Sequence, residues 1–582
     1  MPLPSTLASV LTLAPTRLAG YPPEHRQHLT SALQAQNLRW QAPTATLSHI
    51  ARLEKSETVA VVSGQQAGFL GGPALTVWKI LTTIHLAQAL ETQGYPAVPV
   101  FWIASEDNDF EEVRHTTILD ANGSPLTLTY PTRPPGQPSV GAILLDGQVE
   151  ATLQQLEAAL PRTEFTADLC QKLEATHAPG SPWCDAFARW LHHLFAPFGV
   201  ILVDPRDEHL RRLTQPVMET VIHQTPELIA RLVQQAQQYV SNGRQPQVKV
   251  SPTSTPLFLE VDGNRTPLLQ DGNRFRLKSA PEKTYTTLDL VHILRQEPLR
   301  LTPNALLRPV IQDVLFPTVA QVVGPAEMQY LSQSQLIYDH LGIHAPARWA
   351  RASVTLLESR HAKTLDKLGL TPASVLLGTQ ELARQAMTKL ADTKTLDCFR
   401  EVKATFEAEL DRLKQSLHES DPSLAEALER GREKIFYQLN GLEQRFLTNQ
   451  AQRHATLLRQ IERATAALAP FGKPQERVLN ILSFLVKYGP QLVTHSYHQL
   501  DFSTSDHQWL SPVPAGRDKS EAAGPAPGDF LSPAHLWKRP GLVRPREVVV
   551  HTVVGQHSGN FFWIGVRRGD TVVLPTQKPG QV

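Results

Sequence analysis

One segment near the N-terminus restricts the fold more than any other part of the sequence. Residues 59–63 form an apolar, β-branched run, which the glycine-rich sequence GQQAGFLGGP follows over residues 64–73. Apolar residues then recur every three or four positions from about residue 74 to 92, and a second apolar run spans residues 97–104. This order of strand, turn, helix and strand predicts a βαβ unit with two buried parallel strands.

Later segments extend this pattern to a doubly wound α/β core. The run GVILVD at residues 199–204 precedes a helical pattern over about 208–240, and residues 319–323 precede a helix expected at 326–340. A last strand is expected near residues 343–349. We therefore predict an α/β fold with a Rossmann-like core over residues 1–373. Insertions are expected near 116–198 and 241–300, and turn-rich alternation at 116–150 and 246–280 indicates that they are β-rich.

The C-terminal third predicts a different architecture. Glycine nearly disappears over residues 374–470, where apolar residues recur every three or four positions on both sides of a break at residues 420–423. This predicts a long antiparallel α-helical coiled coil with helices of around 40 residues. Such helices reach beyond a compact core, so a second subunit is expected to cover them in a homodimer. Residues 471–510 should return to the core as a helix, 511–533 form a flexible linker, and 534–582 form a short β-rich tail without an assigned role.

Composition excludes several classes of protein. The 582 residues include 56 basic and 55 acidic side chains, so no basic surface for nucleic acid is expected. Nothing approaches the ~18 consecutive apolar residues of a membrane span. The three cysteines, Cys170, Cys184 and Cys398, fit neither a metal-binding pair nor a disulfide framework. A cytoplasmic protein is the simplest expectation, and the sequence leaves a metal requirement open.

Ligands of open α/β sheets bind at the carboxyl ends of the strands, which selects three segments. The first is the glycine-rich loop, whose glycines permit close backbone approach and whose paired glutamines add amide groups. Its spacing matches neither a Walker A loop nor a dinucleotide-binding fingerprint. An ordinary strand-to-helix turn is the alternative.

The second segment is acidic and follows the strand that ends at residue 104. Its sequence SEDNDFEEVRH places five carboxylates within seven positions, 106–112. Such carboxylates repel one another, so some should bind a cation or an ammonium group, or share a proton. The alternative is a solvated helix N-terminus, where acidic side chains are favourable. Glu111 and Glu112 fit that alternative better than Glu106, Asp107 and Asp109.

The third segment comprises residues 306–313 and 323–330. Arg308 could bind a carboxylate through two hydrogen bonds, and Gly324 precedes a predicted helix N-terminus that could bind an anion. A structural salt bridge between Arg308 and Asp313 is the alternative.

These motifs together resemble the BshC family of bacillithiol biosynthesis. The resemblance rests on SGQQAGFLGGP, PVFWIASEDNDFEEVRH, LLRPVIQDVLFPTVAQVVGPAEMQYLSQ and ERVLNILSFLVKYGP, in that order, and covers about residues 1–505. The family usually has a histidine between the two aspartates of the acidic motif, where this chain has Asn108. The tail beyond about residue 510 has no match.

The resemblance implies a fold and an activity. It implies a Rossmann-like core with connecting-peptide insertions, similar to the nucleotidyltransferase-like fold of class I aminoacyl-tRNA synthetases, and a dimerising coiled coil. It also implies an amide-forming ligase that joins the carboxyl group of cysteine to the glucosamine amine of glucosaminyl-malate. Neither the HIGH nor the KMSKS signature of the synthetases is present, so their adenylation chemistry is not transferred.

A mechanism follows as a hypothesis. The glycine-rich loop and Lys79 would hold an anionic group, Arg308 would bind a carboxylate, and the acidic residues would bind or deprotonate the amine. The expected catalytic residues are Glu106, Asp107, Asp109 and His115, although a lone histidine is more often only hydrogen-bonded. The expected substrate-binding residues are Gly64, Gln65, Gln66, Gly68, Gly71, Gly72, Lys79, Trp102, Ser105, Asn108, Arg308, Gln312, Asp313, Gly324, Glu327 and Tyr330.

An adenine nucleotide, ATP or ADP, is expected from the resemblance, with Asn480, Lys487 and Tyr488 as its contacts and its role as substrate or regulator left open. Two other functions remain as alternatives. One is a nucleotidyltransferase that adenylates a small acid, and the other is a non-enzymatic dimeric scaffold that senses a nucleotide. All the site predictions assume that residues near 64, 106, 308 and 324 converge to line a common pocket.

Overall fold

The computed structural model describes residues 5–390, 393–453, 455–513, 554–557 and 560–563, in two compact units, Met1–Ala515 and Gly516–Val582. In the second unit the described residues form one antiparallel pair, β15 (Val554–His557) and β16 (Asn560–Trp563). Except for residues 511–513, the predicted linker lies outside the described residues, and so does the tail apart from this pair.

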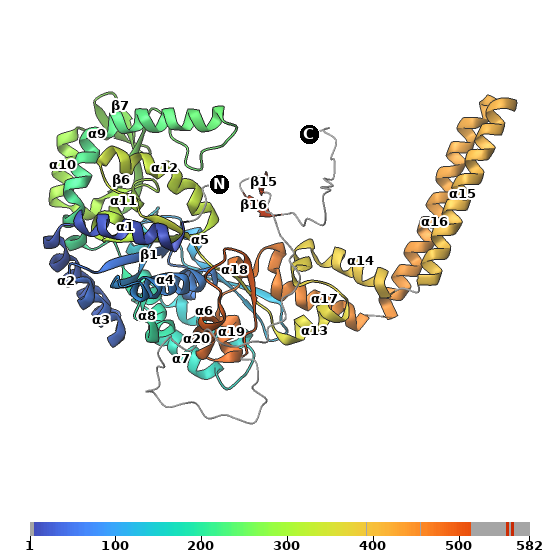
Figure 1. The fold of residues 1–582 in the computed structure, drawn as a ribbon, viewed down its shortest axis with the longest axis horizontal. Helices are drawn as coiled ribbons and strands as arrows, with labels where there is room; N and C mark the ends of the chain where they lie inside the picture. Colours follow the sequence, from blue (N-terminus) through green and yellow to red (C-terminus); the bar gives the residue numbers. More distant parts are fainter. Residues whose placement is uncertain (1–4, 391–392, 454, 514–553, 558–559, 564–582) are drawn as a thin grey trace. The chain divides into compact units, whose positions relative to one another are not determined.

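A five-stranded parallel sheet lies at the centre of the first unit (Figure 1), with the order β12-β11-β1-β2-β5. The strands are β1 (Val59–Gln65), β2 (Ala97–Ile103), β5 (Ile201–Val203), β11 (Thr318–Val323) and β12 (Ala347–Ala350). The predicted βαβ unit is confirmed, because β1 and β2 pair in parallel and α4 (Leu75–Thr92) connects them.

Helices cover both faces of this sheet. Val59 and Val61 pack in one cluster with residues of α1 (Leu7–Ala19) and α4. Ala60 and Val62 pack in another cluster with residues of α2 (Pro23–Arg39) and α3 (Thr44–Leu53). Side chains alternate across a strand, so an uninterrupted apolar strand such as β1 requires cover on both sides. The Rossmann-like prediction is therefore confirmed.

The first insertion differs from the predicted β-rich segment. One antiparallel hairpin, β3 (His115–Leu119) with β4 (Pro125–Thr129), is present, and Gly123 occupies its turn with φ 82°. Three helices follow: α6 (Gln148–Ala159), α7 (Thr166–Thr176) and α8 (Trp183–Leu194). Only the hairpin part of the prediction was right, because the alternation of polar and apolar residues does not extend past the hairpin.

The second insertion is β-rich as predicted. Strands β6 (Ser254–Val261), β7 (Asn264–Asp271), β8 (Arg274–Leu277) and β9 (Thr284–Tyr285) form an antiparallel meander that β10 (Leu301–Pro303) extends. Asp262 and Gly263 join β6 to β7 with φ values of 52° and 72°, as a two-residue hairpin turn requires. The long helix α9 (Glu208–Ser241) begins at Asp207, whose side chain accepts hydrogen bonds from the first turn, and packs on α10 (Thr287–Gln296).

The coiled coil is confirmed, although its helices are shorter than predicted. It consists of α15 (Thr393–Ser420) and α16 (Ala425–Arg453), of 28 and 29 residues, which run side by side (Figure 1). Ion pairs of 2.7 Å between Lys403 and Glu443 and of 2.6 Å between Lys414 and Glu429 fix the antiparallel register. The helical segments α14 (Thr379–Leu390) and α17 (Ala455–Leu468) are separate elements that pack on each other. The predicted helices of around 40 residues were too long because they included these two segments.

The segment at 471–510, predicted as a helix that returns to the core, does not form one helix, and its first part contains two: α18 (Gln475–Val478) and α19 (Leu482–Tyr488). The break arises because the backbone at 479–480 pairs with the core. Ala74 N donates to Leu479 O at 2.8 Å, and Asn480 N donates to Thr117 O at 2.7 Å. Further on, α20 (Gln491–Gln499) precedes β14 (His507–Leu510), which pairs in parallel with β13 (Ser353–Leu356).

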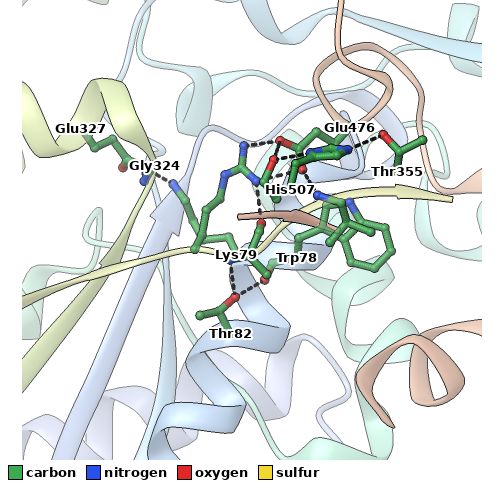
Figure 2. Close-up of polar contacts among 12 residues, drawn as sticks. Trp78, Lys79, Thr82, Gly324, Glu327, Thr355, Glu476 and His507 are labelled. Carbon is green, nitrogen blue, oxygen red and sulfur yellow. Dashed lines mark hydrogen bonds and ion pairs between the residues drawn. The ribbon is translucent and has the colours of Figure 1, made fainter. Parts of the chain in front are cut away.

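A buried ion pair joins this C-terminal segment to the core (Figure 2). Arg351 donates from both terminal nitrogens to the two oxygens of Glu476, at 2.9 and 2.7 Å, and both side chains are less than 5% exposed. Val354 N also donates to Glu476, at 2.8 Å. Burial raises the pKa of Glu476, but Arg351 and these hydrogen bonds outweigh burial and hold the pKa below its ordinary value. No helix within the described ranges is both long and apolar enough to cross a membrane.

We predict that Glu476→Gln lowers the free energy of unfolding by about 3–5 kcal/mol, because it leaves the charge of Arg351 buried and unpaired. The matched control Glu157→Gln removes an exposed ion pair with Arg162 and should cost at most about 1 kcal/mol. The difference in free energy of unfolding between wild type and Glu476→Gln should be fully present above the ordinary glutamate pKa of about 4.3. It should disappear as the pH falls through the lower pKa that Glu476 has in the folded state. Urea unfolding followed by tryptophan fluorescence measures both variants, and equal midpoints would contradict the prediction.

Candidate functional site

The ammonium group of Lys79 lies at the carboxyl end of β1 and is the most buried basic group in the predicted site. It comes from the first turns of α4, is 1% exposed, and donates to Gly64 O at 2.7 Å, Gln65 Oε1 at 3.0 Å and Glu327 Oε2 at 2.6 Å. Burial lowers the pKa of Lys79, and Glu327 acts against this shift. An ammonium group has three donors, and all three are used. Direct anion binding by Lys79, as predicted from the sequence, is therefore not supported.

The start of α12 (Pro325–Leu341) is tied to the same lysine (Figure 2). Glu327 Oε2 accepts both from Lys79 and from Gly324 N, the latter at 2.8 Å. This carboxylate closes a capping box at the helix N-terminus. The anion site expected at Gly324 thus already contains a carboxylate of the protein.

Arg308 begins α11 (Arg308–Leu315) and lies beside the same group of residues. Its guanidinium carbon is 5.9 Å from the ring centroid of Trp102, and Nη1 donates to Gln312 Oε1 at 3.0 Å. Burial raises the pKa of Tyr330, as does the charge of Glu327, whereas Arg308 lowers it. Arg308 is half-buried and no carboxylate of the described residues lies within ion-pair distance of it. It remains the candidate for binding a substrate carboxylate.

Asp313 lies apart from Arg308, so the alternative of an Arg308–Asp313 salt bridge is wrong. Its side chain is fully buried and accepts from Gln312 Nε2 at 3.1 Å, from Gln321 Nε2 at 2.8 Å and from Tyr338. Burial raises its pKa. Asp313 is therefore a structural residue within α11, which contradicts its prediction as a substrate ligand.

The acidic segment divides into residues that face the glycine-rich loop and residues that face the core. Gln66 Nε2 donates to Asp107 Oδ2 and to Glu112 Oε2, both at 2.7 Å. Asp109 caps the short helix α5 (Phe110–Val113), where its Oδ1 accepts from Glu112 N at 3.0 Å. Asn108 reaches Arg265 O only at 3.5 Å. His115 is exposed at the start of β3.

Glu106 and Ser105 face the core, which contradicts their predicted contact with substrate. Glu106 is 5% exposed and forms an ion pair with Arg211 of α9, which is 3% exposed. Ser105 is fully buried and donates to Asp204. The sequence analysis missed Arg211 and also Arg265, whose pKa burial lowers to about 10 although the charge of Asp107 acts against this shift. Arg211 follows the carboxyl end of β5, so the strand-end rule that selected the other residues could have found it.

Steric contacts explain the glycines of the loop that follows β1. A Cβ atom at Gly64 would lie 2.9 Å from Trp102 O, and one at Gly68 would lie 2.6 Å from the Cα of Gly72. The predicted loop residues Gly71 and Gly72 have positive φ values of 96° and 69°. Gln65 and Gln66 are consecutive, yet Gln65 bonds to Lys79 and Gln66 to the carboxylates. The contacts of Lys79, Gln66 and Arg308 show that the segments near 64, 106, 308 and 324 lie close together, and that they line a common pocket stays a prediction.

The three residues expected to bind a nucleotide are engaged within the protein. Asn480 is fully buried; its Nδ2 donates to Leu70 O and to Thr116 Oγ1, both at 2.9 Å. Lys487 Nζ lies 3.1 Å from both oxygens of Glu358, and Tyr488 donates to Glu358 at 2.7 Å. Their donors and the charge of Lys487 are used, so these residues do not fit a phosphate-binding set in this arrangement.

Known families match almost the whole first unit. The model described as "Bacillithiol biosynthesis BshC, N-terminal Rossmann-like domain" matches residues 14–352, and the model described as "Bacillithiol biosynthesis BshC, C-terminal coiled-coil domain" matches residues 354–511. The chain belongs to the BshC family. The resemblance inferred from the motifs is thus confirmed, and the family's second domain begins 20 residues before the predicted boundary at 374.

Curated relatives in the BshC family cover most of the chain. Proteins named "Putative cysteine ligase BshC" from Salinibacter ruber and Solibacter usitatus are 33% and 34% identical over 488 residues, which is 84% of this chain and 89% and 90% of the relatives. The relative of that name from Chlorobaculum tepidum is 32% identical over 499 residues, with 83% and 88% coverage.

We predict that Gly64→Ala lowers the free energy of unfolding by about 1–3 kcal/mol, because the added methyl group overlaps the backbone of β2. Gly147→Ala is the matched control, since a Cβ atom there meets nothing within 4 Å and its φ is −60°. The control should be neutral or stabilising by about 0.4–1 kcal/mol. Denaturant unfolding of both proteins tests this, and equal stability would show that the loop can move away from Trp102.

Proposed function

We propose that this protein is a cysteine ligase of bacillithiol biosynthesis that forms the amide between the carboxyl group of L-cysteine and the amine of glucosaminyl-malate. Membership of the BshC family supports this reaction, and so does the name of its relatives, "Putative cysteine ligase BshC". The observation that carries it is the placement of Gln65 and Gln66. Gln65 contacts Lys79 in the cationic half of the site, and Gln66 contacts Asp107 and Glu112 in the carboxylate half. This arrangement suits the reaction because amide formation must hold an acid beside an amine.

The cationic half suits carboxylates. Lys79 and Arg351 are each paired with a glutamate, whereas Arg308 interacts with Gln312 and Tyr330 and has no carboxylate partner among the described residues. A guanidinium group can bind a carboxylate through two parallel hydrogen bonds. We assign Arg308 to a carboxylate of the substrates, and we assign Lys79 and Glu327 to the support of the loop.

The carboxylate half suits an amine. Asp107, Asp109 and Glu112 lie at the end of β2 and at the start of α5, and none forms an ion pair with a described lysine or arginine within 4.0 Å. Opposite charge within hydrogen-bonding distance favours the ammonium form of an amine. These residues are therefore assigned to the glucosamine amine of glucosaminyl-malate.

Amide formation from a free carboxylate and an amine is unfavourable in water, so the carboxyl group must be activated. We propose ATP as the activating co-substrate on this ground. Asn480, Lys487 and Tyr488 do not fit as its phosphate contacts in the present arrangement, and no step is assigned to them. An assay with and without nucleotide separates an activating role from a regulatory one.

The test is an assay of purified full-length protein with L-cysteine, glucosaminyl-malate and ATP, with bacillithiol detected by mass spectrometry. We expect product, and we expect Arg308→Ala to raise the KM for one substrate about 10- to 100-fold, because a hydrogen bond to a charged group contributes about 1.5–3 kcal/mol. Arg162→Ala, an exposed arginine before α7, should retain wild-type KM. Absence of product with every nucleotide would refute the ligase proposal. Exchange of pyrophosphate into ATP without ligation would instead support an adenylating enzyme.

We also propose that the coiled coil forms a homodimer. Phe406, Leu413 and Leu442 of α15 and α16 are 42%, 46% and 54% exposed, an apolar surface that another copy of these helices could cover. Light scattering of the full chain should give twice the monomer mass. Leu413→Lys with Leu442→Lys should shift the protein to monomer, and a monomeric wild type at micromolar concentration would contradict the proposal.

A further inference from the structure

The amide nitrogen of Gln66 lies between two carboxylates in a way that indicates more than a structural contact. Gln66 directly follows β1, Asp107 follows β2, and Glu112 belongs to α5. Three separate segments therefore meet at one nitrogen atom. Both distances, to Asp107 Oδ2 and Glu112 Oε2, are 2.7 Å. A primary amide has two N–H donors, and this geometry uses both.

Two acceptor oxygens around one nitrogen are also what the amine of a substrate needs. An ammonium or amine group can donate to both carboxylates as the amide of Gln66 does, and it adds the charge that the amide lacks. We infer that Glu112 is the general base of the reaction: the substrate amine replaces the amide of Gln66 between Asp107 and Glu112, and Glu112 accepts its proton. This inference rests on the proposed ligase function.

A comparison of the surroundings of the four carboxylates favours Glu112 as the general base. Glu106 is neutralised by Arg211, and Asp109 is used as the cap of α5. Asp107 lies near the cation of Arg265. Each of these three carboxylates is therefore already engaged with another group of the protein.

Glu112 is surrounded mainly by groups that favour its protonated form. The side chain of Glu112 is exposed, yet desolvation by the neighbouring protein raises its pKa, as do the charges of Asp107 and Asp109, whereas the hydrogen bond from Gln66 and the charge of His115 lower it. The net shift is upward, towards the range in which a general base is efficient near neutral pH. Glu111, the preceding residue, has its side chain 61% exposed beside Arg114 and Arg133.

The chemical step starts from the neutral amine, so a bound ammonium group first gives one proton to Glu112, which passes it to solvent and leaves the nitrogen with a free lone pair. The lone pair of the amine nitrogen forms the new C–N bond to the carbonyl carbon of an activated cysteinyl group, an acyl phosphate or acyl adenylate. The bond from that carbon to the activating oxygen breaks, and the leaving phosphate or nucleotide takes the electron pair. The N–H proton passes to the carboxylate of Glu112, which releases it to solvent.

The experiment compares Glu112→Gln with the matched control Glu111→Gln in the full chain, with saturating cysteine, glucosaminyl-malate and ATP. We expect kcat of Glu112→Gln to fall by about 100-fold or more, as the loss of a general base does, while Glu111→Gln keeps kcat within about threefold of wild type. Wild-type kcat should rise with pH through a pKa above the ordinary glutamate value, and Glu112→Gln should lose this dependence.

Two results would overturn the inference. One is unchanged activity of Glu112→Gln, and the other is a variant that is slower but keeps the wild-type pH dependence, which indicates a structural role. Calorimetric binding of glucosaminyl-malate and of glucosyl-malate, which carries a hydroxyl group in place of the amine, adds a readout independent of turnover. Wild type should prefer glucosaminyl-malate, and Glu112→Gln should lose most of that preference. A wild type that neither ligates nor binds glucosaminyl-malate refutes the proposed function together with this inference, whereas an active wild type with a fully active variant refutes the inference alone.

Discussion

The buried ammonium group of Lys79 is the interaction on which the rest of the site depends. An unpaired charge in a protein interior is too costly to persist, so a buried lysine either loses its proton or gathers partners. Lys79 gathers the carbonyl group of Gly64, the amide oxygen of Gln65 and the carboxylate of Glu327. These partners come from the end of β1 and from α12, so one side chain of α4 sets the relative position of three elements.

The two halves of the site follow from this arrangement. With Gln65 bound to Lys79, Gln66 is directed to the carboxylates at the end of β2. The same loop is held from behind by Asn480, which donates to the carbonyl of Leu70, a residue with φ 54°. The segment after the coiled coil therefore supports the conformation of the glycine-rich loop, and the buried pair of Arg351 with Glu476 fastens that segment to the core.

The parts of the structure that local sequence determines were predicted well. The apolar strands and the three-to-four residue spacing of α4 gave the βαβ unit, and the Asp-Gly-Asn turns gave the hairpins of the second insertion. The strand-end rule brought the loop, the acidic segment and Arg308 together. Long-range pairing was not predictable in the same way. The pairing of Lys79 with Glu327, the ion pair of Glu106 with Arg211 and the helix break at 479–481 depend on residues more than 100 positions apart. For the same reason, the functional assignments of Glu106 and Asp313 failed: nothing local distinguishes a carboxylate that faces the core from one that faces the loop.

A crystal structure of the full chain with glucosaminyl-malate bound tests most directly whether Lys79 organises the site without contacting the substrate. The amine should lie within hydrogen-bonding distance of Asp107 and Glu112, and a malyl carboxylate should contact Arg308, while Lys79 keeps Gly64, Gln65 and Glu327 as its partners. A malyl carboxylate bound to Lys79 with Glu327 displaced, or a ligand bound away from the carboxyl end of β1, would contradict this arrangement.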